Sequence, residues 1–175
     1  MAESWDFFET PRLTAEKLLP EHFDVMLAQN QDEQFSAMIG GKRDAEQTRE
    51  RMRGAFEIWD ANGFGVWVLR DKSSARVIGR AVLRPIEVEG VRELEIGYAF
   101  YEAWWGKGLA TEIAREIVRL ARERLGATSF VALTNKENAA SAHVLAKCGF
   151  APAGTHVLEG TELNLHRAKF AATGA

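Results

Sequence analysis

The chain has 175 residues, and its 22 lysines and arginines nearly balance 25 aspartates and glutamates, which gives a formal net charge of -3. This length suits one domain with a full hydrophobic core, and because no composition break divides the chain, we expect a single domain over residues 1–175. The mixed charges form no basic stripe, which argues against a nucleic-acid partner.

The chain also lacks the sequence signals of export and of metal binding. No segment approaches the roughly 20 apolar residues that span a bilayer, and the N-terminal MAESWDFFET lacks the basic and apolar regions of a secretory signal. We therefore expect a cytoplasmic protein with no membrane partner. Cys148 is the single cysteine, which excludes an intrachain disulfide, and no cysteine–histidine cluster has the spacing of a zinc site, so no metal is predicted.

The first third of the chain predicts one strand and two helices. Residues 10–18 alternate weakly between apolar and polar side chains, which indicates an opening strand, and residues 20–30 have the pattern of a short helix. A longer helix is expected to begin after Asp44, because Asp44 and Gln47 can form a capping box. The Asn-Gly pair at residues 62–63 is expected to end it.

Three strand-like segments follow this helix. They are FGVWVLRD at residues 64–71, ARVIGRAVLRP at 75–85 and RELEIGYAF at 92–100. The connections DKSSA and IEVEG are rich in turn-forming residues and short enough for neighbouring strands to pair antiparallel. We therefore expect an antiparallel meander.

The second half of the chain predicts alternating helices and strands. After Gly108 an amphipathic segment carries apolar residues on one helical face. These residues are Leu109, Ile113, Ile117, Leu120 and Leu125. Residues 128–133 are apolar and β-branched enough for a buried strand, which predicts a strand, helix, strand crossover. The segment 138–150 predicts a short helix, and residues 150–170 predict two strands joined by a tight Glu-Gly turn.

Gly106 and Gly108 lie directly before the amphipathic helix, in the sequence WWGKGLA. A helix N-terminus presents unpaired N–H groups and the positive end of the helix dipole, so this turn could bind a phosphate or pyrophosphate. The glycines would let a ligand approach the backbone, and Lys107 would add a positive charge. The alternative is a loop that only shapes the entry to a core helix. The segment matches neither the GxGxxG nor the GxxxxGK[ST] nucleotide motif.

The segments ELEIGYAF, WWGKGLA and NAASAHVLAKCGF together resemble the coenzyme A binding core of the GNAT superfamily of N-acetyltransferases. TPRLTAEKLLPEH and GFGVWVLRD further resemble the branch that contains the ribosomal-protein N-terminal alanine and serine acetyltransferases, so the likeness covers nearly the whole chain. The superfamily pattern [QR]-x-x-G-x-[GA] lies over residues 105–110, where Gly108 and Ala110 match and Trp105 replaces the usual Gln or Arg. The resemblance implies an α/β fold with a mixed, centrally splayed sheet of about seven strands and about four helices.

The resemblance also implies acetyl-CoA as co-substrate and a set of residues that bind it. In the family the turn wraps the pyrophosphate with backbone amides, and the end of the preceding strand pairs with the pantetheine arm. The matching positions are Trp105, Gly106, Lys107, Gly108, Leu109 and Ala110 in the turn, Tyr98, Ala99 and Phe100 on the strand, and Asn138 at the later helix. Glu102 stands where the family usually has proline, which leaves the exit of that strand open.

Two residues are candidates for the chemistry. The family often places a carboxylate base where this chain has Glu95, with Glu93 as its nearest rival; the alternative is a solvated strand carboxylate. The tyrosine that many members use as the acid is replaced by Leu145. In the ribosomal branch a serine is a proposed donor, and Ser141 occupies that position, where it could instead only bond the helix backbone.

Other polar and reactive side chains could have either a structural or a functional role. His143 reads as a surface histidine and Cys148 as a small core residue. The polar residues of the last hairpin could line the acceptor pocket or only reflect a sheet edge. They are His156, Glu162, Asn164 and His166.

The resemblance implies acetyl transfer from acetyl-CoA directly to a primary amine in a ternary complex. An α-amine costs about 0.5 kcal/mol to neutralise near pH 7.4 and a lysine about 4, so we expect a peptide or protein α-amine as acceptor. The alternatives are a small-molecule amine such as a polyamine, aminoglycoside or amino acid, a coenzyme A binding module without activity, and an anion-binding structural domain. The sequence leaves monomer and homodimer open.

Overall fold

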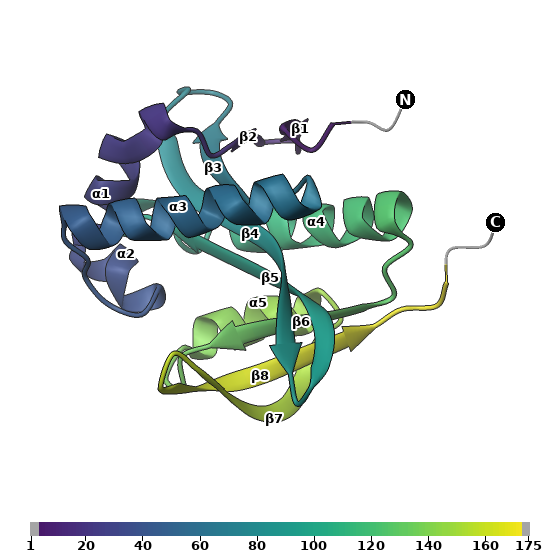
Figure 1. The fold of residues 1–175 in the computed structure, drawn as a ribbon. Helices are drawn as coiled ribbons and strands as arrows, with labels where there is room; N and C mark the ends of the chain where they lie inside the picture. Colours follow the sequence, from purple (N-terminus) through teal and green to yellow (C-terminus); the bar gives the residue numbers. More distant parts are fainter. Residues whose placement is uncertain (1–3, 173–175) are drawn as a thin grey trace.

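A computed structural model describes residues 4–172 and contains a single eight-stranded sheet in the order β1-β2-β3-β4-β5-β6-β8-β7 (Figure 1). The strands are β1 (Phe7–Glu9), β2 (Leu13–Lys17), β3 (Val66–Asp71), β4 (Val77–Val88), β5 (Val91–Phe100), β6 (Ser129–Thr134), β7 (Ala151–Leu158) and β8 (Thr161–Lys169). All neighbours pair antiparallel except β5 and β6, which are parallel. The expected meander and the expected crossover are both confirmed.

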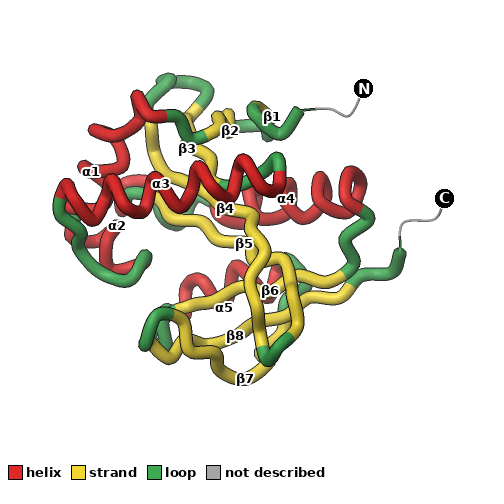
Figure 2. The backbone as a smooth tube through the Cα atoms, in the orientation of Figure 1, coloured by secondary structure: helices red, strands yellow, loops and turns green. Residues whose placement is uncertain are grey.

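Helices cover both faces of this sheet (Figure 2). They are α1 (Phe23–Gln31), α2 (Glu33–Met38), α3 (Ala45–Asn62), α4 (Leu109–Leu125) and α5 (Ala139–Lys147), with short 3-10 turns at Pro20–His22 and Glu102–Trp104. The apolar stripe of α4 packs on one face, and α1 and α3 pack on the other against Val68. The capping box of Asp44 and Gln47 starts α3 as expected.

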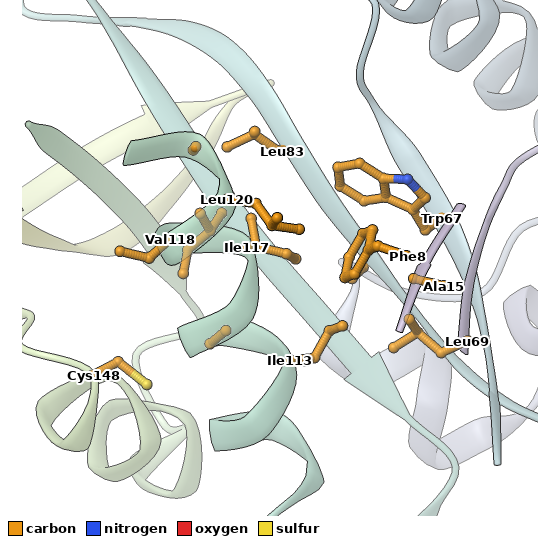
Figure 3. Close-up of a cluster of buried hydrophobic side chains, with 14 of the residues drawn as sticks. Phe8, Ala15, Trp67, Leu69, Leu83, Ile113, Ile117, Val118, Leu120 and Cys148 are labelled. Atoms are coloured by element: carbon orange, nitrogen blue, oxygen red, sulfur yellow. The ribbon is translucent and has the colours of Figure 1, made fainter. Parts of the chain in front are cut away.

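The main core lies between α4 and the sheet, and Figure 3 shows its centre. Ile113 and Ile117 of α4 are fully buried against the strand residues Leu83 and Trp67. Burying each such aliphatic side chain stabilises the fold by about 1.5–3 kcal/mol. The indole N–H of Trp67 donates to the carbonyl of Trp5 over 2.8 Å, so this large buried ring leaves no polar atom unpaired.

Three details differ from the sequence-based expectation. The sheet has eight strands and five α-helices within residues 4–172, because the three-residue β1 and the six-residue α2 were not expected. The segment IEVEG is mostly strand, since β4 continues to Val88 before a two-residue turn. Leu125 does not join the buried stripe of α4: it is 43% exposed at the last position of the helix.

The sheet opens between β5 and β6. Their pairing is confined to two positions, Leu94 with Phe130 and Glu95 with Val131. The rest of β5, from Ile96 to Phe100, has no ladder partner on its β6 side among the described residues. This splay leaves one edge of β5 unpaired, and the unpaired segment runs toward the turn that precedes α4. Within residues 4–172, no helix combines the length and apolar character required to cross a bilayer.

Candidate active site

The turn before α4 has the geometry of an anion site. Gly106 and Gly108 have φ of 70° and 78°, a left-handed conformation that glycine adopts without strain. Gly108 is the N-cap of α4, and no side chain caps the helix. Within residues 4–172, the backbone N–H groups of residues 106–111 form no hydrogen bond. These free donors and the helix dipole can together hold a phosphate group.

The flanking side chains of the turn form its walls. The Lys107 ammonium lies 4.6 Å from the ring centroid of Trp104, so its charge remains on the turn surface. Trp105 is 42% exposed, and its indole N–H donates to the Phe100 carbonyl over 2.8 Å. This bond ties the turn to the end of β5. The carbonyl of Phe100 is thus already engaged within the chain, although the resemblance assigns this strand end to pantetheine.

Arg12 is a cation of the turn that the sequence did not reveal. Its Nη1 donates to the carbonyl of Lys107 over 2.8 Å, and its Nε lies 2.7 Å from Glu112 in the first turn of α4. A Cβ built on Gly108 would lie 3.5 Å from Arg12 Nη2. No local pattern could reveal this contact, because 95 residues separate Arg12 from Lys107.

Glu95 lies at the base of the splay, in the last residue pair that β5 forms with β6. The solvated carboxylate considered from the sequence is wrong: Glu95 is 6% exposed, and its Oε2 accepts a hydrogen bond from Arg84 Nε over 2.5 Å. Arg84 is its direct partner in the β4–β5 ladder, so both side chains leave the same face. The Arg84 guanidinium on β4 thus holds the Glu95 carboxylate on β5 in place.

Glu93, the rival base, lies in a different environment. Its carboxylate pairs with Arg167 over 2.7 Å and accepts a bond from Ser129. These residues line a hollow of about 740 Å³ at the other end of β5. The Arg167 hydrogen bonds lower the pKa of Glu93. No residue of the turn before α4 lines this hollow, and Glu93 and Glu95, two residues apart on β5, pair with different arginines.

Ser141 and Tyr98 form a hydroxyl pair across the mouth of the splay. Asn138 caps α5 by accepting from the backbone N–H of Ser141 over 3.0 Å. The Ser141 hydroxyl lies 3.1 Å from the phenol oxygen of Tyr98. Burial raises the pKa of Tyr98 to about 12, so the phenol is a neutral donor near pH 7. The sequence suggested Tyr98 only for its backbone and did not reveal this contact.

The other sequence candidates are placed away from this pair or inside the core. Leu145 is buried, and His143 is exposed on α5. His166 is buried and hydrogen-bonded to Thr134 over 3.0 Å, and desolvation lowers its pKa. Glu162 pairs with Lys136 on the surface. His166 is therefore a structural residue of β8, whereas His156 and Asn164 are partly exposed on the hairpin.

Comparison with known proteins identifies the family. Residues 12–151 match the model described as "Acetyltransferase (GNAT) domain". This match includes the splayed strands, the glycine turn, α4 and α5. The chain therefore belongs to the GNAT family of acetyltransferases, and acetyl-CoA is its co-substrate.

The chain is also similar to individual proteins, and solved structures share its fold. The chain is 29% identical to the uncharacterized protein YkkB of Bacillus subtilis over 118 residues, 67% of this chain and 69% of YkkB. An acetyltransferase structure from Agrobacterium tumefaciens superposes with a TM-score of 0.80 at 22% identity and covers 95% of this chain and 96% of its own. A ribosomal L7/L12 α-N-protein acetyltransferase in complex with coenzyme A superposes at 0.72 and 16% identity, covering 94% and 98%.

Proposed function

We propose that this protein transfers the acetyl group of acetyl-CoA directly to an α-amine, with the coenzyme lying in the splay between β5 and β6. The supporting observation is the alignment of two open features: the uncapped α4 N-terminus and the unpaired edge of β5. The first suits a pyrophosphate, and the second offers backbone groups to an extended amide-containing arm. Glu95 stands where the open edge begins.

The reaction requires one proton to leave the amine and one to reach the sulfur. The amine nitrogen forms a bond to the thioester carbonyl carbon, and the carbon–sulfur bond breaks to release a thiolate. In this proposal Glu95 accepts the amine proton: Arg84 engages Oε2, which leaves Oε1 for the amine or a bridging water. Ser141, whose hydroxyl lies 3.1 Å from the Tyr98 phenol, gives its proton to the thiolate, and solvent then carries the proton from Glu95 back to the serine.

The preference for an α-amine follows from the cost of making the nucleophile neutral. An α-amine has a pKa near 7.8, so about a third is neutral at pH 7.4, whereas a lysine amine costs about 4 kcal/mol to deprotonate. The site contains one carboxylate for this task, and that carboxylate is already ion-paired with Arg84. Structural neighbours include a ribosomal-protein-S5-alanine acetyltransferase and an aminoglycoside acetyltransferase, at 17% and 14% identity, so the acceptor class rests on the amine chemistry.

Short peptides test this preference directly. Each peptide contains one lysine and carries either a free or a blocked N-terminus, and mass spectrometry locates the acetyl group after reaction with acetyl-CoA. We expect modification of the free α-amine and none of the lysine. Acetylation confined to lysine, or equal turnover of blocked peptides, would contradict the proposal. Turnover of small amines alone would assign a small-molecule acceptor.

A further inference from the structure

Four arginines gather on the face of the sheet that carries Glu95. Arg80 and Arg84 leave the same face of β4, opposite Ala99 and Glu95 of β5. Arg43 precedes α3, and Arg51 lies within its second turn. Figure 1 shows α1 and α2 beside one end of α3, and α1 and α3 pack on this side of the sheet.

Two of these arginines have carboxylate partners and two do not. Arg84 pairs with Glu95, and Arg51 donates to Glu159 over 2.7 Å. Within residues 4–172, neither Arg80 nor Arg43 has a carboxylate within 4.0 Å. Glu159, the partner of Arg51, attracts Arg43 only from a longer distance. The cluster thus contains two guanidinium groups without a direct ion pair beside the proposed acetyl-transfer site.

Of the two, Arg80 has the greater need of a counterion. Its partly buried guanidinium reaches Asn30 Oδ1 at 3.2 Å and Met26 Sδ at 3.6 Å, and lies 5.4 Å from the ring centroid of Phe35. Neutral partners compensate a desolvated cation poorly. Burial, followed by repulsion from Arg43, lowers the pKa of Arg80 to about 10. The guanidinium is held in place but not neutralised.

Arg43 extends the same positive region toward an open hollow. Its Nη2 donates to the carbonyl of Ile39 over 2.7 Å. Arg43 and Arg51 line a hollow of about 340 Å³ at the start of α3 together with Glu46, Gln47 and Glu50, so a small molecule can reach Arg43 from this side. Burial and the nearby Arg51 lower the pKa of Arg43. The nearby Glu159 acts in the opposite direction and raises this pKa, and a bound anion would do the same.

We propose that Arg80 and Arg43 bind an oxyanion of the acceptor molecule, a carboxylate or a group of the same geometry, while its amine lies near Glu95. This inference rests on the proposed function and names the substrate class of the same site. Guanidinium groups bind carboxylates with two parallel hydrogen bonds, which fixes orientation as well as charge. The acceptor is therefore an amino acid, or a peptide with an acidic residue next to its N-terminus.

The register of the sheet determines how far apart the amine and the oxyanion of such an acceptor can be. The residue pair Val82 and Gly97 lies between the Arg80 and Glu95 positions, about 7 Å along the strands from each. An acceptor amine bound over Gly97, on the sheet face that carries Glu95, could therefore reach the Glu95 carboxylate. An acceptor carboxylate one or two bonds from that amine could reach the Arg80 guanidinium on the opposite side. Amines with a carboxylate close by fit this spacing, and polyamines carry the wrong charge.

Matched acceptors test the proposal. An α-amino acid and its amide, and peptides with glutamate or glutamine at position 2, are compared as acceptors by thiol release. One pair tests the free acid and the other the acidic peptide. The wild-type protein is expected to favour the anionic member of at least one pair by about 10–100-fold in kcat/KM. Equal turnover of acid and amide in both pairs would overturn the proposal.

Substitutions of Arg80 test whether this residue causes the preference for anionic acceptors. Arg80→Met is expected to raise KM for the preferred anionic acceptor by about 10–100-fold and leave the neutral one unchanged, and Arg80→Lys is expected to recover part of the loss. Arg92→Met is the control, because Arg92 also donates to one asparagine Oδ1 at 3.2 Å but lies on the exposed β4–β5 hairpin. An equal loss for anionic and neutral acceptors would assign Arg80 a purely structural role and contradict the proposal.

Binding separates failure of this inference from failure of acetyl transfer. Thermal unfolding is followed with free coenzyme A and each acid or amide, for the wild-type protein and Arg80→Met. If no amine is turned over but the acids alone stabilise the wild-type protein, the oxyanion site stands and the proposed function fails. If acids and amides stabilise it equally, the oxyanion site is wrong whether or not turnover occurs.

Discussion

At the scale of single residues, the site depends on side chains held by partners from distant parts of the chain. Arg84 holds Glu95 and Tyr98 contacts Ser141, although 43 residues separate the latter two. Sequence reasoning identified Glu95 and Ser141 but described Glu95 as a possible solvated residue. The sequence could not predict that the Glu95 carboxylate is buried, because burial of a strand carboxylate depends on which residue the neighbouring strand places opposite it.

Glu95→Gln tests the proton acceptor at this scale. With an α-amine substrate, kcat/KM is expected to fall by about 10²-fold at pH 7 and by much less at pH 9, because most of an α-amine with a pKa near 7.8 is already neutral there. Rates of thiol release across this pH range provide the measurement. A loss of the same size at both pH values would assign Glu95 to positioning through Arg84 and not to proton transfer.

Ser141→Ala tests the proton donor. Loss of its hydroxyl is expected to lower kcat by about 10²-fold, the low end for general acids, because the leaving thiol has a pKa near 8.5. The affinity for acetyl-CoA, measured by calorimetry, is expected to remain unchanged. Ser129→Ala is the matched control, since Ser129 donates to Glu93 at the other end of β5. Wild-type turnover in Ser141→Ala would remove Ser141 from the mechanism.

At the scale of elements, most helices and strands follow from local pattern, and the exceptions are short. The capping box predicted the start of α3, and the amphipathic stripe predicted α4. The three-residue β1 and the six-residue α2 carry too few residues for a period to emerge. Leu125 follows the α4 stripe but is 43% exposed at the last position of the helix, where the chain turns at Gly126. Periodicity predicts a helical face and not the extent of the surface it meets.

The α4 turn provides a prediction with an internal control. Gly108 and Gly126 flank α4 with φ of 78° and 65°, so an alanine at either position costs about 1–2 kcal/mol of backbone strain. Gly108→Ala is expected to weaken acetyl-CoA binding about tenfold, because its Cβ would lie at the N-terminus of α4, 3.5 Å from Arg12 Nη2, where the phosphate is expected to bind. Gly126→Ala should lose similar stability but retain affinity. Calorimetric titration and thermal unfolding measure both, and equal affinity in the two variants would exclude the turn from the site.

The Glu93–Arg167 pair, which connects β5 to β8 across β6, predicts how stability depends on pH. The folded state lowers the pKa of Glu93 through its Arg167 hydrogen bonds, so this contribution is complete above the ordinary value of 4.5 and is lost as pH falls through the lowered folded pKa. Glu93→Gln is therefore expected to reduce the difference in unfolding free energy between pH 7 and pH 3. Urea titrations at the two pH values measure it, and an unchanged difference would contradict this role.

At the scale of the whole molecule, the resemblance of a few segments predicted the topology, including the splayed sheet. Those segments are local, and two of them, WWGKGLA and NAASAHVLAKCGF, combine a helix end with a glycine turn. The arginine cluster was not predicted, because Arg43 and Arg80 belong to elements that meet only in the folded protein. Charged residues on a strand ordinarily face solvent, and no local pattern distinguishes Arg80 from that case.

The two-residue contact between β5 and β6 has a mechanical consequence. It divides the sheet into a five-strand and a three-strand part, and within residues 4–172 two residue pairs form the only ladder between these parts. A ligand that bonds to both strand edges would supply the missing backbone bonds and make the two parts unfold as one cooperative unit. Acetyl-CoA is therefore expected to slow amide hydrogen exchange beyond its own contacts, in β3 and β8 as well as in β5. Protection limited to the turn and β5 would show that the two parts open independently with the coenzyme bound.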